Sequence, residues 1–368
     1  MTAIASVHSS DTTIPASSMP LIAPHALLHA HLSQSPPRRP SDRSLTEFRP
    51  IQLNVGSLTH CNGSSVVKIG ETTIVCGVRA EILPVTEIPS FRVNKTSQTH
   101  DRTAPSRRKD GNGVEEEEQE FLGQDTISLY NLVVPNIELA TGCSPRHAAN
   151  TPPSVEAQSI SQRLLSLLHT SRLIRTSDLE IIYTPPTVES QSQELGIDTD
   201  PQLKAYWTIY IDMMCISYGG SVFEAAWLAL YAALKNTVLP NARWDADLSQ
   251  VLCSAEGAES RHLVLKSMPV PTSFAVFTPE KRLQSRLGAD GVPHWILVDT
   301  DSFEEECCDE SGCITIDAVD ETTPLAILRI EKHGGGIVDM QGIEDLLVAA
   351  QERSRQWKQV LAGALKDS

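Results

Sequence analysis

Residues Asn62–Glu81, NGSSVVKIGETTIVCGVRAE, give the clearest indication of the fold. Apolar residues recur at every second position over residues 74–82, which is the periodicity of a β-strand. A second candidate strand covers residues 64–69, and Gly70–Glu71 between the two apolar runs predicts a turn. We therefore expect a strand, a turn and a longer strand that ends at Pro84.

Length and composition place this stretch in an ordinary globular protein. The chain has 368 residues, which suggests two domains or one duplicated fold. Hydrophobic residues make up 40% and charged residues 21%, which excludes a wholly disordered chain. With 46 acidic and 30 basic side chains, the net charge is −16. Such an acidic chain is not expected to grip a nucleic acid alone, because that requires clustered Lys and Arg.

The cysteines favour a reducing, intracellular setting. There are 8 of them, none in a CxxC pair, and several lie in apolar runs as buried thiols do. Cys307, Cys308 and Cys313 are close in sequence but have no histidine at a matching spacing, so we expect no metal site. We also expect no membrane span and no secretory signal, since no apolar run is long enough and the N-terminus lacks the signal pattern.

Two segments have the composition of poorly packed chain. Residues 1–40 are rich in Ser, Pro and Thr and are expected to form a disordered or loosely docked arm with one short helix within residues 21–32. Residues 94–120 change from a basic run to the acidic run Glu115–Glu120 and are expected to form a disordered insertion. The role of this acidic insertion stays open.

The remaining chain alternates between strands and helices. We expect strands at 51–55, 127–134, 179–183 and 206–216, and a helix capped by Ser154 with Ile160, Leu164, Leu167 and Leu168 on its apolar face. Gly219–Gly220 leads into an alanine-rich helix, for which Ser221 and Glu224 predict a capping box. A second half has candidate strands at 263–265, 273–277, 295–298, 314–316 and 325–330, and a long terminal helix.

Strands come first and helices last in each half, which predicts a duplicated α+β fold. The first domain would cover residues 41–250, including the insertion at 94–120, and the second would cover residues 251–368 with the terminal helix.

Several motifs occur in an order that is more specific than any one of them. They are Arg49-Pro50-Ile51, Gly56 and Asn62–Glu81; Val134–Ala140 with Cys143-Ser144-Pro145; Ala157-Gln158-Ser159 with Arg163-Leu164-Leu165; Ile211-Asp212, Gly219–Gly220 and Phe223–Ala226; and Asp299 with Glu304-Glu305. Over about residues 41–350 this order resembles the RNase PH family, and most of all the noncatalytic-type ring subunits of the eukaryotic RNA exosome.

The resemblance implies the RNase PH fold, with two ββαβα units of the ribosomal protein S5 domain 2-like type, and a six-membered ring of such chains. Active members of the family cleave RNA from its 3′ end, with inorganic phosphate as the attacking group. A helix N-terminus suits that phosphate, and Gly219, Gly220 and Ser221 could supply it. Asp299 matches the first family carboxylate and Glu305 lies near the second.

Active relatives add an arginine just inside this helix, where the present chain has Val222 or Phe223. An apolar side chain cannot replace a guanidinium that binds phosphate. We therefore interpret the pocket as degenerate and Asp299 and Glu305 as residues of a solvated loop. The alternatives are an active phosphorolytic 3′–5′ exoribonuclease with an arginine donated by its neighbour, magnesium-assisted hydrolysis, and a stand-alone RNA-binding module.

The resemblance also implies partners. These would be the other RNase PH-like subunits of a hetero-hexameric ring, cap subunits, an associated nuclease and RNA inside the channel, in the nucleus, nucleolus and cytoplasm. Lys68, Arg79 and Arg146 are candidate phosphate contacts, although a surface salt bridge explains each of them equally well. No cofactor is expected. His60, His147 and His333 have no partner at an informative spacing and are interpreted as loop or packing residues.

Overall fold

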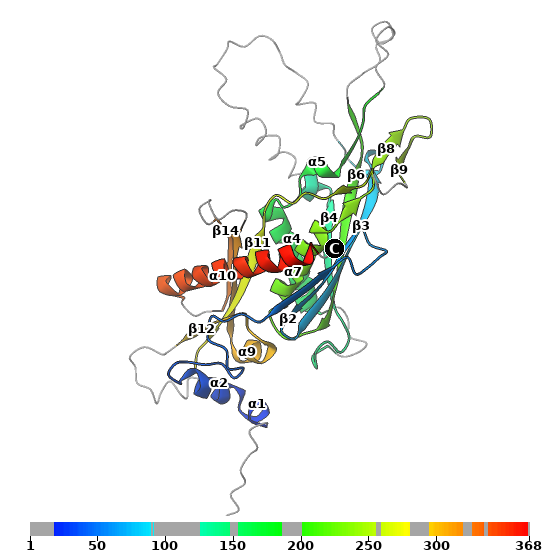
Figure 1. The fold of residues 1–368 in the computed structure, drawn as a ribbon. Coiled ribbons are helices and arrows are strands. Elements are labelled where there is room, and N and C mark those ends of the chain that lie inside the picture. The colour runs from blue at the N-terminus through cyan, green and yellow to red at the C-terminus, as the bar shows by residue number, and fades with distance from the viewer. Residues whose placement is uncertain are drawn as a thin grey trace, which may run out of the picture.

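The computed structural model describes residues 18–89, 91, 126–147, 154–185, 201–254, 259–279, 294–318, 326–334 and 338–366. The predicted insertion at 94–120 and residues 1–17 of the arm lie outside the described residues. Within them, the strands form two large sheets and two small two-stranded ones, with helices between and beside the large sheets (Figure 1).

The larger sheet has the strand order β1-β2-β3-β6-β4, and β5 pairs with β6 beside this path. Its strands are β1 (Ile51–Val55), β2 (Gly63–Ile69), β3 (Thr72–Pro84), β4 (Val133–Leu139), β5 (Glu180–Tyr183) and β6 (Gln202–Ser217). All neighbours are antiparallel except β4 and β6. The predicted strand–turn–strand unit is confirmed: Ile69 pairs with Thr72, and Gly70 between them has a φ of +56° that favours glycine.

Two helices cover one face of this sheet. Helix α4 (Val155–Ser171) begins at Ser154, whose side chain accepts a hydrogen bond from the Ala157 amide, as predicted. The four leucine and isoleucine residues of its predicted apolar face are buried. Helix α7 (Val222–Lys235) uses its alanines to approach the sheet, and Ser65 of β2 donates a 2.7 Å hydrogen bond to the Ala229 carbonyl.

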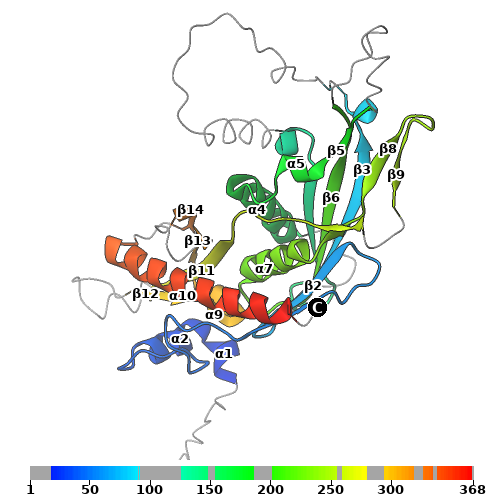
Figure 2. The ribbon, with the colours of Figure 1, turned by 45° about the horizontal axis from the view of Figure 1, so that its top comes forward.

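The smaller sheet is antiparallel with the order β12-β11-β13-β14. Its strands are β11 (Pro269–Phe277), β12 (Trp295–Val298), β13 (Glu310–Asp317) and β14 (Ala326–His333), with the short helix α9 (Ser302–Cys307) after β12. The terminal helix α10 (Met340–Ala364) packs on this sheet and on β1. Figures 1 and 2 both show α4 and α7 between the two sheets.

Smaller elements complete the described chain. They are the 3-10 turn η2 (Val85–Glu87), α5 (Thr176–Leu179), the pair β7 (Val238–Leu239) and β10 (Arg261–His262), and the hairpin β8 (Ala242–Asp245) and β9 (Gln250–Cys253). One hydrophobic core contains residues of both sheets and of α10; Val67, Ile314 and Trp357 are examples. The division after residue 250 therefore stays a prediction, since that position lies inside β9.

The N-terminal arm is docked more firmly than the sequence predicts. Helices α1 (Met19–Ile22) and α2 (Pro24–Leu32) form, and Leu28 and Leu32 are 0% and 1% exposed. Together with Phe277 and Leu297 they build a second, smaller core. The described part of the arm is thus anchored by Leu28 and Leu32 of α2. The Ser- and Pro-rich composition did not predict such firm docking.

Two strand predictions are wrong in position. Residues 126–129 are helical rather than the start of a strand at 127, and β4 begins only at Val133. Residues 263–265 are not a strand, since β10 ends at His262 and Leu265 makes an isolated bridge with Ile174. In both places, burial of apolar residues such as Ile127 and Leu263 produces an apolar run without a strand.

The α+β class is confirmed, with strands followed by a helix in both halves. Among the described residues, no helix is long and apolar enough to cross a membrane.

Candidate functional site: a glycine turn closed by buried ion pairs

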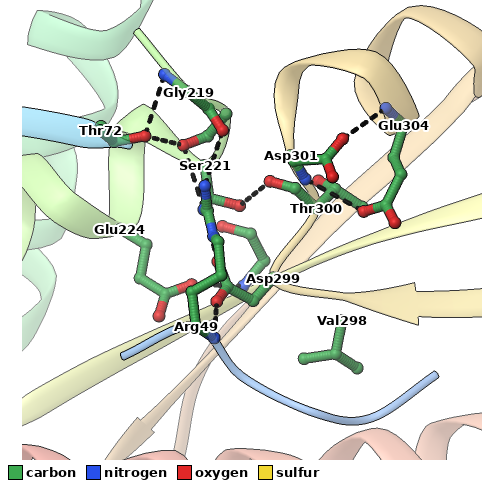
Figure 3. A network of polar contacts seen from close by, with 12 residues as sticks. Arg49, Thr72, Gly219, Ser221, Glu224, Val298, Asp299, Thr300, Asp301 and Glu304 are labelled. Carbon is green, nitrogen blue, oxygen red and sulfur yellow. Dashed lines mark hydrogen bonds and ion pairs between the residues drawn. The ribbon is translucent and has the colours of Figure 1, made fainter. Parts of the chain in front are cut away.

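The glycine turn before α7 faces the segment that joins β12 to α9, so Gly219 and Ser221 lie near Asp299 (Figure 3), and the Ser221 amide contacts Glu305 of α9. Gly220 has a φ of +93°, and a Cβ there would lie 2.5 Å from the Thr300 carbonyl oxygen. A Cβ on Gly219 would lie 2.8 Å from the Glu71 Cβ. Both glycines are therefore required by close approach, and the turn brings Ser221 beside Asp299 and Glu305.

Arg49 fills this junction with a guanidinium that the sequence did not assign. Its Nε and Nη2 donate to Asp299 Oδ1 at 3.0 and 2.6 Å, and its backbone amide donates to Oδ2 at 2.7 Å. Nη1 donates to the Gly219 carbonyl at 2.6 Å and Nη2 to the Gly220 carbonyl at 3.2 Å. A cation is therefore present at the start of α7, but protein groups surround it, and the Arg49-Pro50-Ile51 motif was its only signal in the sequence.

Asp299 is an internal ion-pair partner rather than part of a solvated loop, so that interpretation is wrong. Its side chain is 0% exposed, and its φ of +50° is in the left-handed region. Arg353 of α10 lies 3.8 Å from Oδ2. Burial opposes ionisation, but Arg353 and Arg49 outweigh it and lower the pKa of Asp299.

Glu224 does not form the predicted capping box. Its carboxylate accepts a hydrogen bond from Arg353 Nε and another, at 3.3 Å, from the Ser273 amide. Ser221 adopts a φ of +50° and donates from Oγ to the Thr300 carbonyl at 3.1 Å. Two tertiary contacts thus replace the predicted capping box. Burial raises the pKa of Glu224 despite the nearby positive charge of Arg353.

A capping box does occur at α9, where Asp301 and Glu304 exchange hydrogen bonds with each other's backbone amides. Glu304 is also 0% exposed, and Arg39 Nη1 and Arg43 Nη2 lie 3.3 and 3.5 Å from its Oε2. Arg39 Nη2 donates to the Val298 carbonyl at 2.5 Å. The chain that follows α2 is therefore tied to the entrance of α9 by two arginines, which no local pattern predicted.

Glu305 caps the start of α7. Its Oε1 accepts from the Ser221 amide at 2.7 Å, and Tyr218 Oη lies 3.2 Å from Oε2. Burial raises the pKa of Glu305 to about 7. The Ser221 amide, which could bind an anion at this helix terminus, therefore already donates its hydrogen bond to Glu305.

The three candidate RNA contacts lie elsewhere on the surface. Lys68 is exposed on β2. Arg79 forms a 3.2 Å ion pair with Glu81, and Arg146 forms a 2.6 Å pair with Glu306, with both partners more than half exposed in each pair. These contacts fit the salt-bridge alternative, and a role in RNA binding stays a prediction.

The cysteines and histidines considered as possible metal ligands or acid–base groups also lie in different parts of the structure. Cys307 belongs to the smaller core and Cys313 to the main core. No three His, Cys, Asp or Glu side chains gather to hold a metal ion in the part of the chain that the structure describes. His147 lies outside the helices and strands, and its ring stacks on Tyr218, which fits the predicted packing role; its Nδ1 lies 3.1 Å from Ser144 Oγ and its Nε2 3.9 Å from Glu156.

Solved structures identify this fold. An Archaeoglobus fulgidus exosome with RNA bound to the active site matches 91% of the chain and 96% of its own chain, with a TM-score of 0.56 and 18% identity. An archaeal exosome core matches 95% of the chain and 100% of its own, with a TM-score of 0.55 and 18% identity. The architecture is thus that of RNase PH-type subunits.

The sequence comparison identifies the family. Residues 47–240 match the model of domain 1 of the 3′ exoribonuclease family, RNase PH, and the chain belongs to this family. Exosome complex component rrp43 of Schizosaccharomyces pombe is 32% identical over 217 residues, which is 59% of this chain and 59% of that protein. Exosome complex component Rrp42 of Aeropyrum pernix is 23% identical over 331 residues, 89% of this chain and 90% of the relative.

Proposed function

We propose that the chain is a non-catalytic subunit of an exosome ring, which supports 3′-to-5′ RNA degradation and ribosomal RNA processing. It would contribute to the ring and to the RNA channel. The similarity to exosome components from Schizosaccharomyces pombe and Aeropyrum pernix supports the assembly, and the burial of Asp299 supports the lack of catalysis.

Asp299 carries this proposal because a catalytic carboxylate must reach substrate or water. Its side chain is 0% exposed, both of its oxygens accept hydrogen bonds from Arg49, and Arg353 closes the other side. Releasing Asp299 for chemistry would leave the buried Arg49 guanidinium without its carboxylate partner, which is strongly unfavourable.

The contacts at the start of α7 also support the lack of phosphate binding. Val222 and Phe223, where active relatives carry an arginine, are buried in the core. The Ser221 amide donates to Glu305, and the Gly219 amide donates to Thr72 Oγ1 at 3.1 Å. An incoming phosphate would have to displace these partners and would meet the negative charge of Glu305 when that group is ionised.

The proposed partners are the other RNase PH-like ring subunits, cap subunits, an associated nuclease, and RNA that passes through the assembled channel. The nucleus, nucleolus and cytoplasm are the proposed locations. The net charge of −16 supports dependence on partners, because basic side chains from neighbouring chains would then be needed to attract RNA.

The test is a reconstituted ring supplied with inorganic phosphate and end-labelled RNA. We expect native mass spectrometry to find this chain with RNase PH-like partners, and nucleoside diphosphate release to be unchanged by Glu305→Gln in this chain. Loss of that release in an intact ring carrying Glu305→Gln or Asp299→Asn would establish the alternative, an active phosphorolytic exoribonuclease. Purification of the native chain as a lone monomer would contradict the ring assignment.

A further inference from the structure

Tyr218, which follows β6, lies between two carboxyl groups. Its Oη is 2.6 Å from Glu156 Oε1 on α4 and 3.2 Å from Glu305 Oε2 on α9. A phenol carries one proton and can donate it to one acceptor only. The shorter contact assigns that proton to Glu156, so the contact with Glu305 is a hydrogen bond only when the Glu305 carboxyl carries a proton of its own.

The other oxygen of Glu305 is already engaged, since Oε1 accepts from the Ser221 amide. A protonated Glu305 would thus satisfy both of its oxygens: Oε1 accepts from the start of α7, and Oε2 donates to Tyr218. An ionised Glu305 would face the lone pairs of Tyr218 and, beyond them, the charge of Glu156.

We propose that the cluster of Tyr218, Glu305 and Glu156 takes up one proton, which resides on Glu305, and that this uptake fastens α9 to the first turns of α4 and α7. The junction is then a pH-sensitive connection between the two halves of the chain. Burial raises the pKa of Glu305 to about 7 and the charge of Glu156 acts in the same direction, whereas the Ser221 amide, Tyr218 and Arg49 lower it.

The charged and titratable groups around Glu305 fit this assignment. Arg49, on the side of β1, favours the ionised form but is itself bound to Asp299, and the Cys308 thiol follows the helix. On other sides of α9, Glu304 faces Arg39 and Arg43, and Glu306 pairs with Arg146. Strand β11 contributes no ionisable side chain, and His25 and His29 of α2 contact Phe277 and Trp295, respectively.

The proton has a route to water. The Glu156 side chain is 40% exposed, and its Oε2 lies 3.9 Å from Nε2 of His147. His147 in turn contacts Ser144, and its ring stacks on Tyr218 with the centroids 6.1 Å apart. Glu305 is thus connected to solvent through Tyr218 and the partly exposed Glu156.

The test follows side-chain carboxyl groups of the full-length chain by infrared difference spectroscopy or ¹³C NMR between pH 5 and 9. We expect one carboxyl titrating near pH 7 that disappears in Glu305→Gln and moves to lower pH in Glu156→Gln, because a nearby negative charge has been removed. Glu306→Gln, the next position on α9 with an exposed side chain, is the matched control and should leave the titration unchanged.

Hydrogen exchange gives a second readout. Exchange at the Ser221 amide should speed up on raising the pH from 6 to 8 by more than the tenfold per pH unit expected for base catalysis alone, and this excess should be lost in Glu305→Gln. A Glu305 carboxyl that titrates below pH 5, or a titration that Glu156→Gln leaves in place, would overturn the proposal. If Glu305→Gln does not fold, the shift in Glu156→Gln decides the matter. None of these measurements depends on ring assembly or on RNA.

Discussion

Arg49 and Asp299 form a buried ion pair although 250 positions separate them in the chain. Asp299 Oδ1 accepts two guanidinium hydrogen bonds, and Oδ2 accepts the backbone amide of the same arginine. The pair joins the start of the large sheet to the end of β12, and the same guanidinium holds the two carbonyls of the glycine turn before α7. One interaction therefore fixes the geometry of the whole junction.

Replacing Arg49 by alanine should destabilise the protein severely. Removing one partner of a buried pair leaves an uncompensated charge, which costs about 3–5 kcal/mol. Urea denaturation should record this loss. The control is Arg79→Ala, which removes an arginine from an exposed pair with Glu81 and should cost less than about 1 kcal/mol. Equal effects of the two substitutions would argue against the role assigned to Arg49.

Alanine at Gly220 should disrupt the turn. The φ of +93° disfavours any side chain, and the new Cβ would lie 2.5 Å from the backbone of residues 300 and 301. We expect a fall in Tm for Gly220→Ala. Gly363→Ala, in the last turn of α10 with no heavy atom within 4 Å of the added Cβ, should instead be neutral or stabilising by up to about 1 kcal/mol.

The Asp299 ion pairs predict acid sensitivity. The pKa of this carboxyl is lower in the folded than in the unfolded state, so its contribution to stability is complete above the unfolded value of about 3.9. It is lost as the pH falls through the lower, folded value. The free energy of unfolding of the wild type should therefore fall below about pH 4, whereas Asp299→Asn, weaker at neutral pH, should lose less over this range. Denaturation curves between pH 2 and 6 measure the difference.

Leu28 should anchor the N-terminal arm. The residue is 0% exposed in the smaller core, and Leu→Ala changes at such sites cost about 2–5 kcal/mol. We expect Leu28→Ala to expose residues 19–32 to proteolysis and to speed up their hydrogen exchange. Leu21→Ala changes a residue that is 88% exposed and should leave both unchanged. A wild-type arm already as sensitive as Leu28→Ala would restore the loosely docked interpretation.

The fold could be predicted largely from local pattern, and the site could not. Period-two alternation around Cys76 and the leucines of α4 gave the right elements, because burial on one face leaves a regular trace in sequence. The capping box was misplaced because Ser221–Glu224 and Asp301–Glu304 have the same spacing. Both glutamates face an arginine, but the Ser221 hydroxyl bonds to the Thr300 carbonyl, whereas Asp301 accepts from the Glu304 amide and completes a box. The ion pair between Arg49 and Asp299 could not be predicted, because residues 250 positions apart form no local sequence pattern.

Arg353 is translated long after its partner Glu224, and this order affects how the protein folds during synthesis. Glu224 is made 129 positions earlier, and it is 0% exposed beside that arginine in the finished protein. A nascent polypeptide emerging from the ribosome can therefore form α7 but cannot neutralise its glutamate until the last helix has been translated. Until then the first half would remain incompletely packed, because Glu224 would lack Arg353. Chaperones would bind the nascent chain mainly during that interval.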